Sequence, residues 1–367
     1  MKFFKKVLFL LFLSFFILSC NNEKNELYNG SEIEVSKPKA KINEKLRKDE
    51  DYKKLKENIK ALKYKDSVFL INSLVKKYPK TPELLYLFAV ITKNIDHDPL
   101  EAIKILEVVI ALDYNYSDAW KLLGDLYYIR GEFKKSIKSW ELAIEGITNN
   151  ANLYYKLAYV YYTVKDYNLA VKYFLKSLKL DKTLEWSYYY LADINFRNLR
   201  KLEEAESFIK KGLEVLPNNK NLMQKLAIFK FKLSQYELAI KWNKEVLKQD
   251  KDDNFAIENI SNSYSKLKKY DKSIEWLNKV FKKKPKSIYY AKKLAELYKL
   301  SNRLEKSIEY LNFAYNIKKD ANLKDSIARL YLILGNKEKF KEILNELSKS
   351  KDPEDLRVYE YLKVEMK

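Results

Sequence analysis

The feature that most constrains this chain is a unit of two short amphipathic segments, Ser117 to Asn150, that recurs along it. In its first half, four residues have the i, i+3, i+4 and i+7 spacing of one apolar helix face: Trp120, Leu123, Gly124 and Tyr127. The residues of its second half that keep the same helical rhythm are Phe133, Ser136, Ile137, Trp140 and Ala143. Two such helices cannot bury both apolar faces alone, so the unit needs copies of itself as neighbours.

The copies extend the pattern over most of the chain. We align eight units, at residues 83–116, 117–150, 151–184, 185–219, 220–253, 254–287, 288–320 and 321–354. The eighth position of each unit is small except at Val90, with Gly124, Ala158, Ala192, Ala227, Ser261, Ala295 and Ala328. The twentieth is small in seven units, with Ala102, Ser136, Ala170, Ala205, Ala239, Ser273 and Ser307. We expect the two helices of a unit, A and B, to approach most closely at these positions.

These residues carry a family resemblance. The run from Trp120 to Tyr127 resembles the first half of the tetratricopeptide repeat signature, and Ser136 and Trp140 stand where that family has a small and an aromatic residue. Thr148 replaces the usual late proline. The resemblance implies an all-α fold, a right-handed superhelical solenoid of stacked helix-turn-helix repeats. Six glycines and seven prolines, too few for a turn-rich β sandwich, agree with it.

The ends of the array depart from the pattern. Residues 49–82 are expected to form a degenerate first repeat, and residues 355–367 a capping helix that follows the helix-start sequence at Asp352. One extra residue in unit 185–219, near Asn198–Arg200, is most simply placed in a turn. Phe340 occupies a small-residue position in the last unit, so its second helix must pack differently.

Residues 1–19 read as an export leader. Three lysines precede an apolar run, Val7 to Leu18, that is too short to span a bilayer core of about 30 Å as a helix. The sequence that ends in Ser19-Cys20 resembles a bacterial lipobox, which implies cleavage and lipidation of Cys20. An ordinary signal peptide or a short anchor with an incidental cysteine is the alternative.

Residues 20–48 are polar and are expected to be a flexible tether. With the leader and the lipobox, this predicts an exported protein that is lipid-anchored to a bacterial membrane, on its periplasmic face or at the cell surface.

The family resemblance implies a concave groove lined by the A helices. The aromatic residues expected in that groove are Tyr128, Tyr155, Tyr159, Tyr162, Trp186, Tyr189, Phe196 and Phe231. Tyrosine and tryptophan are enriched in binding hot spots, so we expect the groove to hold a peptide or helix of a partner protein. The alternative is that these rings pack between adjacent A helices. The family's carboxylate clamp is not reproduced, because Lys121 is followed by Asp125, and Glu258 precedes Asn262, where the clamp needs cations and asparagines.

Other kinds of site find little support. The single cysteine and single histidine exclude an intrachain disulfide and argue against a Cys/His metal site, and no phosphate-binding loop or nucleophile motif implies a cofactor or an enzyme. His97 is expected to lie in a turn. The formal charge of +21 attracts polyanions in general. We expect no nucleic acid as partner, because the rings and many of the lysines are expected on opposite faces.

The sequence therefore predicts a non-catalytic scaffold of the cell envelope, with a role in envelope or outer-membrane protein assembly suggested by fold analogy alone. The alternative is a surface-exposed basic lipoprotein that binds an acidic polymer or a host molecule. The oligomeric state is left open by the sequence.

Overall fold

The computed structural model describes residues 44–95 and 99–365. Within these ranges the chain forms helices joined by short turns and contains no strand, which confirms the all-α prediction. The predicted leader, Cys20, most of the predicted tether and His97 lie outside the described residues. No helix in the described ranges is long and apolar enough to cross a membrane.

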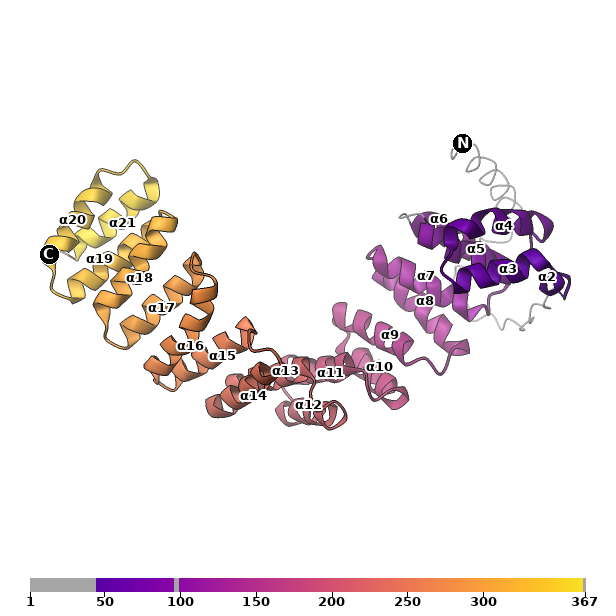
Figure 1. The fold of residues 1–367 in the computed structure, drawn as a ribbon, viewed down its shortest axis with the longest axis horizontal. Helices are drawn as coiled ribbons and strands as arrows, with labels where there is room; N and C mark the ends of the chain where they lie inside the picture. The colour runs from indigo at the N-terminus through magenta and orange to yellow at the C-terminus, as the bar shows by residue number, and fades with distance from the viewer. Residues whose placement is uncertain (1–43, 96–98, 366–367) are drawn as a thin grey trace. The chain divides into compact units, whose positions relative to one another are not determined.

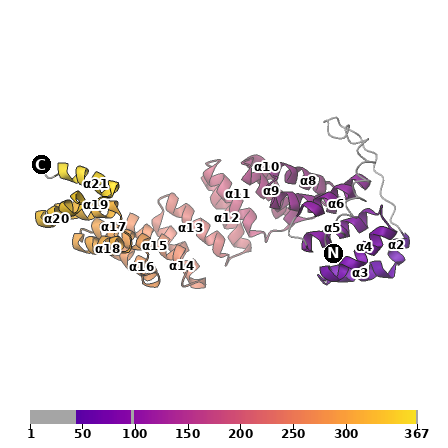
Figure 2. The same cartoon turned by 90° about the horizontal axis from the view of Figure 1, so that it is seen from above.

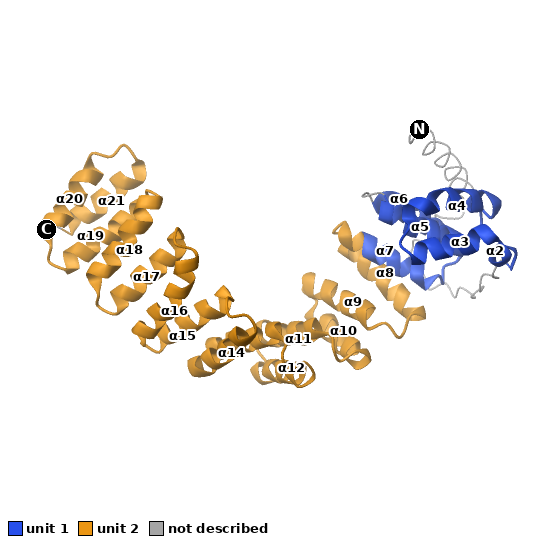
Figure 3. Ribbon diagram, in the orientation of Figure 1, with its two compact units in different colours: residues 1–126 blue, residues 127–367 orange. Residues whose placement is uncertain are grey.

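The chain divides into two compact units, Met1–Leu126 and Tyr127–Lys367 (Figure 3). The helices of the first unit are α2 (Glu44–Lys48), α3 (Glu50–Lys60), α4 (Tyr64–Lys77), α5 (Pro82–Ile95), α6 (Pro99–Leu112) and most of α7 (Ser117–Ile129). Those of the second are α8 (Phe133–Gly146), α9 (Ala151–Thr163), α10 (Tyr167–Leu180), α11 (Glu185–Arg197), α12 (Leu202–Val215), α13 (Lys220–Lys232), α14 (Tyr236–Gln249), α15 (Asn254–Lys266), α16 (Tyr270–Lys283), α17 (Ile288–Leu300), α18 (Leu304–Ile317), α19 (Ala321–Ile333), α20 (Lys337–Ser348) and α21 (Pro353–Val364).

The second unit is a stack of helical hairpins. α9 packs on α10, α11 on α12, α13 on α14, α15 on α16 and α17 on α18, and the second helix of each hairpin also packs on the first helix of the next (Figures 1 and 2). Contacts between elements thus run from neighbour to neighbour. This is the arrangement of a solenoid, in which each repeat is stabilised by the repeats beside it.

The small residues lie where the two helices of a hairpin approach most closely. In the hairpin of α15 and α16, the hydroxyl oxygens of Ser261 and Ser273 are 2.9 Å apart, and each hydroxyl also donates to the other residue's carbonyl at 2.8 Å. In the next hairpin, the Ser307 hydroxyl donates to the Ala295 carbonyl at 2.7 Å. All four residues are at most 2% exposed. A larger side chain at either position would force the helices apart, which explains the restriction seen in the sequence.

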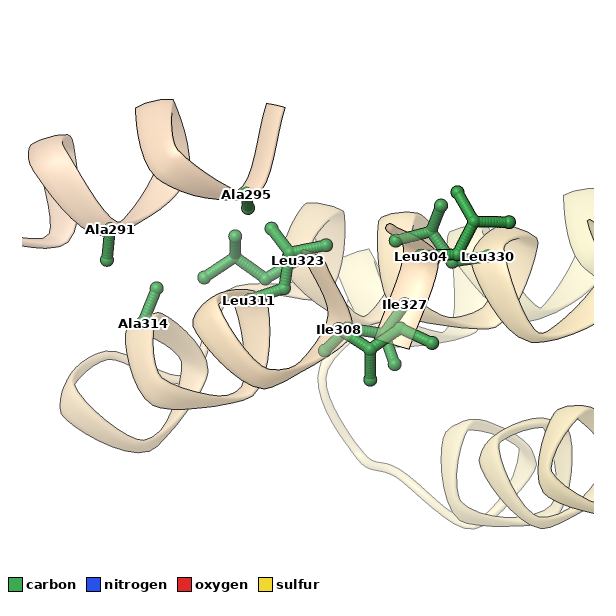
Figure 4. Packing of buried hydrophobic residues seen from close by; sticks show 9 residues of the cluster. All are labelled: Ala291, Ala295, Leu304, Ile308, Leu311, Ala314, Leu323, Ile327 and Leu330. Atoms are coloured by element: carbon green, nitrogen blue, oxygen red, sulfur yellow. The ribbon is translucent and has the colours of Figure 1, made fainter. Parts of the chain in front are cut away.

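Between hairpins the core consists of branched apolar side chains. Figure 4 shows one such cluster, in which residues of α17, α18 and α19 meet: Ala291, Ala295, Leu304, Ile308, Leu311, Ala314, Leu323, Ile327 and Leu330. The alanines of α17 face α18. The leucines and isoleucines of α18 and α19 fill the space between those two helices. Each interface of this kind buries one helix face that would otherwise be exposed.

The predicted tether is too long by five residues. Residues 44–48 belong to the predicted tether because they are polar apart from Leu46. They form α2, whose Leu46 is 1% exposed and packs in a cluster with Tyr52 and Leu55. A single leucine gives no periodicity that a sequence pattern could detect. The predicted repeat at residues 49–82 contains the hairpin of α3 and α4, and its last residue, Pro82, already begins α5. The C-terminal helix spans Pro353–Val364.

The turns between the helices of a hairpin share one backbone feature. One residue of each has a positive φ, the middle one of a three-residue turn or the third of four at Arg200: Leu62, Gly131, Lys165, Arg200, Ser234, Lys268, Asn302 and Gly335. Only two of these are glycine. The extra residue of unit 185–219 is accommodated in the turn that contains Arg200, which has four residues between α11 and α12 where most of the other turns have three.

Replacing Lys268 by glycine is expected to stabilise the protein. Lys268 is exposed and has φ +57°, a left-handed conformation that costs an L-residue about 1–2 kcal/mol. Glycine removes this strain but gains freedom in the unfolded chain, so we expect a net gain of about 0.5–1 kcal/mol in the free energy of unfolding. Chemical denaturation followed by circular dichroism measures it. Lys268→Ala, which keeps the strain, is the control, and an equal gain there would contradict the explanation.

Candidate protein-interaction surface

The eight aromatic residues predicted for the groove all lie on A helices, namely α7, α9, α11 and α13. Trp186 is 41% exposed, and the other seven are partly exposed. None of them belongs to the fully buried core. Their edges are therefore accessible to a partner, while their remaining surface is packed against the protein.

Six of the eight predicted rings form one continuous cluster. Tyr190, which is not among the predicted residues, is its seventh member. The ring cluster, as we call it, consists of Tyr128, Tyr155, Tyr159, Tyr162, Trp186, Tyr189 and Tyr190. Neighbouring ring centroids in it lie 5.0–6.4 Å apart, the range of favourable aromatic contacts. Tyr190 is central, because it contacts rings of both α9 and α11 and rests on the buried ring of Phe174 at 5.5 Å.

The other two predicted residues lie apart from this cluster. Phe196 is stacked on Phe229 of α13, with centroids 4.3 Å apart and planes at 8°. Phe231 meets Tyr236 at 5.3 Å. Phe229 is 2% exposed, so Phe196 packs between adjacent A helices. For Phe196, the alternative expected for the whole set, packing between adjacent A helices, therefore holds.

A buried ion pair adjoins the ring cluster. The Lys225 ammonium group donates to Asp193, and the two side chains are 2% and 4% exposed. Asp193 also accepts from the Tyr162 hydroxyl at 3.0 Å and from the Nε of Arg197 at 3.0 Å. The same ammonium group lies 4.1 Å from the centroid of the Tyr189 ring. Two rings of the cluster are thus held by one charged network, in which the carboxylate serves as the common acceptor.

One member of this network could be recognised from the repeat pattern. Asp193 occupies the ninth position of its repeat, the position of the predicted groove residue Tyr159 in the preceding repeat, so a polar residue is identifiable there. Lys225 and Tyr190 occupy the sixth position of their repeats, where none of the eight predicted groove residues stands. Their roles depend on how α11 packs on α13, and no single-sequence pattern carries that information.

Three hydroxyl groups of the ring cluster, those of Tyr155, Tyr162 and Tyr190, resist ionisation. Burial, followed by the nearby Tyr159, Tyr128 and Glu185, raises the pKa of Tyr155 to about 12. Burial and the charge and hydrogen bond of Asp193 raise the pKa of Tyr162 to about 12. Burial and the neighbouring tyrosines raise the pKa of Tyr190 as well. These hydroxyls therefore stay protonated over the physiological range and can donate to a partner's carbonyl or carboxylate oxygens.

Alkaline titration tests this environment. The folded state raises the pKa of Tyr155 and Tyr162 above the unfolded value of about 10, so their contribution to stability is complete below pH ~10 and is lost as pH rises toward ~12. Difference spectra of the phenolate band for Tyr155→Phe and Tyr162→Phe against the parent protein isolate the two groups. Titration of both near pH ~10 in the folded protein would contradict the burial of these hydroxyls.

A shallow pocket of about 500 Å³ lies elsewhere on the second unit. It is lined by residues of α8, α9 and α10 and of the α8–α9 turn: Glu141, Ile144, Glu145, Thr148, Tyr154, Tyr173 and Lys176. The Tyr161 hydroxyl donates to Glu141 at 2.5 Å, and the Lys176 ammonium group lies 4.4 Å from the centroid of the Tyr154 ring. None of the predicted groove residues lines it. In the described part of the chain, no group of three or more His, Cys, Asp and Glu side chains is placed to hold a metal ion.

Comparison with known proteins identifies the repeats. A family model described as TPR repeat matches residues 124–164, and one described as tetratricopeptide repeat matches residues 151–184 and 256–287. No curated protein matches the chain.

Several solved structures are similar in fold. A tetratricopeptide repeat protein from Parabacteroides merdae is 15% identical, with a TM-score of 0.48, over 68% of this chain and 98% of its own. YrrB, described as a TPR protein with an unusual peptide-binding site, is 22% identical, with a TM-score of 0.42, over 50% of this chain and 94% of its own. PilW, described as a type IV pilus biogenesis factor, is 18% identical, with a TM-score of 0.43, over 57% and 97%. The family models show that the chain contains tetratricopeptide repeats, at residues 124–184 and 256–287.

Proposed function

We propose that this chain is a non-catalytic protein-interaction scaffold of the bacterial cell envelope, anchored to a membrane through a lipidated Cys20. It binds a peptide or a helix of a partner protein on the ring cluster and acts in the assembly of envelope or outer-membrane proteins. The observation that carries the binding role is the ring cluster itself. Seven aromatic side chains from three A helices touch one another while each keeps part of its surface exposed.

Physical chemistry supports a protein partner at this place. Tyrosine and tryptophan supply a large contact area with few rotamers to lose, and their polar tips select hydrogen-bonding partners. Their mutual contacts and the Asp193–Lys225 pair hold the rings in place before binding. A partner therefore loses little free energy in ordering the surface to which it binds.

The test is crosslinking and capture from the native envelope. A variant with Tyr155→Ala, Tyr159→Ala and Trp186→Ala should lose a partner that the parent protein captures, by at least about a hundredfold if two of the rings are hot spots. A matched control replaces two tyrosines and one tryptophan outside the cluster, Tyr264, Tyr298 and Trp276, which are also partly buried. Equal capture by both variants and the parent would refute binding at the ring cluster.

The anchor is tested separately. Mass spectrometry of the envelope form should find an acylated N-terminal Cys20, and Cys20→Ser should release the protein from the membrane fraction. An unmodified N-terminus elsewhere, with the protein in the soluble fraction, would exclude the lipoprotein role.

The formal charge of +21 favours a second candidate, a basic surface lipoprotein that binds an acidic polymer or a host molecule. Salt distinguishes the two functions. Binding of a polyanion falls steeply as the ionic strength rises, because exposed charges are screened beyond about 8 Å at physiological salt, whereas apolar contact with the rings persists. Capture that survives high salt supports the ring cluster, and capture that disappears with salt supports the basic surface.

A further inference from the structure

The first hairpin of the chain, α3 and α4, exposes two large apolar side chains. Phe69 on α4 is 82% exposed, and Leu62 in the preceding turn is 70% exposed, the highest values among the large hydrophobic residues in the described ranges. The opposite face of α4 is fully used by the core, because Ser67, Leu70, Ile71 and Leu74 are buried. Phe69 therefore contributes nothing to the packing of the hairpin, and its exposure needs another explanation.

Unpaired lysines lie close to these two residues along the chain. On α4, Lys65 precedes Phe69 by one helical turn and Lys76 follows it by two, so all three share the outward face. Lys60 and Lys63 flank Leu62. None of these four ammonium groups forms an ion pair or a hydrogen bond with another described residue, whereas Lys53, Lys56 and Lys77 of the same hairpin are paired with acids. The exposed acid on this face of α4 is Asp66.

The charge is concentrated in this hairpin. Residues 44–80 contain twelve Lys and Arg against six Asp and Glu, while residues 21–43 contain four lysines and four glutamates. An exposed aromatic side chain with lysines near it is suited to the headgroup region of an anionic bilayer. There the ring enters the acyl boundary and each ammonium group meets phosphate.

We propose that Leu62, Phe69, Lys60, Lys63, Lys65 and Lys76 form a membrane-contact patch that docks the first hairpin onto an anionic lipid surface. Charge complementarity argues for this occupant, and so does the position of the hairpin in the chain. Only 23 residues, at most about 80 Å of extended chain, separate Cys20 from Glu44, where α2 begins. The hairpin follows α2 directly, so both lie near the proposed anchor in the sequence. That second argument rests on the proposed function, and the experiment below therefore uses protein without the anchor.

The test is vesicle binding by the chain that begins at Asn21, which lacks the lipidation site and keeps every described helix. It should sediment with vesicles of phosphatidylglycerol and phosphatidylcholine but not with phosphatidylcholine alone. Lys65→Gln with Lys76→Gln should weaken binding about twenty-five-fold, since each lysine near an anionic surface contributes about fivefold. Phe69→Ser should weaken it about fivefold, because a ring that enters the acyl boundary leaves water. The matched control, Lys241→Gln with Lys244→Gln on α14, removes two exposed lysines elsewhere and should change little.

A fluorescent label locates the contact. The chain from Asn21 has no cysteine, so Ser73→Cys places a single environment-sensitive dye one turn from Phe69 on the exposed face of α4. Its emission should rise and shift to the blue on anionic vesicles, and the same dye at Ser348→Cys on α20 should not respond.

Absence of binding to anionic vesicles, equal losses in the control pair, or equal responses of the two dyes would overturn the proposal. If Phe69→Ser instead removes a crosslinked protein and leaves vesicle binding unchanged, the patch is a protein contact and the proposal is wrong. Failure of Cys20 acylation leaves these results unaffected and bears only on the anchor.

Discussion

Replacing Lys225 by methionine is expected to destabilise the second unit by about 3–5 kcal/mol. The substitution keeps most of the side-chain volume but leaves Asp193 as a carboxylate only 4% exposed without its buried counterion. The cost comes from this uncompensated charge and much less from the lost contact, because forming the pair already required desolvation of both groups.

The measurement must be local, because long repeat arrays often unfold in more than one step. Native-state hydrogen exchange should show the largest loss of protection in α11, α13 and their neighbours, with much smaller changes in α19–α21. The double variant Asp193→Leu with Lys225→Met removes both charges and should recover most of the loss. The difference between the double variant and the two single ones gives the coupling energy directly.

Arg197 provides the sharpest control. Its Nε also contacts Asp193, but its side chain is 65% exposed and can therefore remain hydrated in either state. Arg197→Gln alone should cost no more than about 1 kcal/mol. A loss of under about 1 kcal/mol in Lys225→Met would show that Arg197 compensates the buried carboxylate by itself, and the assignment of Lys225 as the essential counterion would be wrong.

The same variant separates two roles of the network. Tyr162 and Tyr189 both contact it, one through a hydroxyl and the other through its ring face. If the network positions these rings for a partner, Lys225→Met should weaken partner capture even at temperatures where the protein remains fully folded. The double variant should restore stability but not capture, which a purely structural role would not produce.

The fold could be predicted from sequence because its strongest constraint is local. Ser261 and Ser273 touch across a hairpin, so any larger residue would be excluded there, and that exclusion is visible as a small residue at the same place in successive units. The short helix α2 shows the limit, because Leu46 is a single apolar residue among charges and its burial depends on Tyr52 and Leu55 of α3.

The candidate site was predictable only in outline. Six of the rings on the A helices meet in one cluster, but Phe196 lies against Phe229, and helical spacing alone treats these rings alike. Whether a ring at a given position remains accessible depends on the residue that the next helix presents to it. Lys225 presents an ammonium group to Tyr189, whereas Phe229 presents a ring to Phe196.

Replacing Phe340 by alanine is expected to destabilise the C-terminal end of the stack by about 3–5 kcal/mol. Phe340 occupies a position that is small in the other units, and the structure shows why a large side chain is accommodated there. The ring is 1% exposed and lies in a cluster shared by three helices: α19 with Ala328, α20 with Leu344 and Leu347, and α21 with Val358 and Leu362. α21 packs on α19 as well as on α20, so the phenylalanine fills a space that exists only at the last hairpin.

Because a solenoid is stabilised repeat by repeat, the loss should remain local. Hydrogen exchange of α20 and α21 should approach that of an unfolded segment, while α9–α16 keep their protection. Phe340→Leu, which retains most of the apolar volume, should cost about 1–1.5 kcal/mol and serves as the matched control. Loss of protection throughout the second unit in Phe340→Ala would show that the terminal cluster supports the whole stack. Its stability would then be cooperative over many repeats and not the sum of neighbouring interfaces.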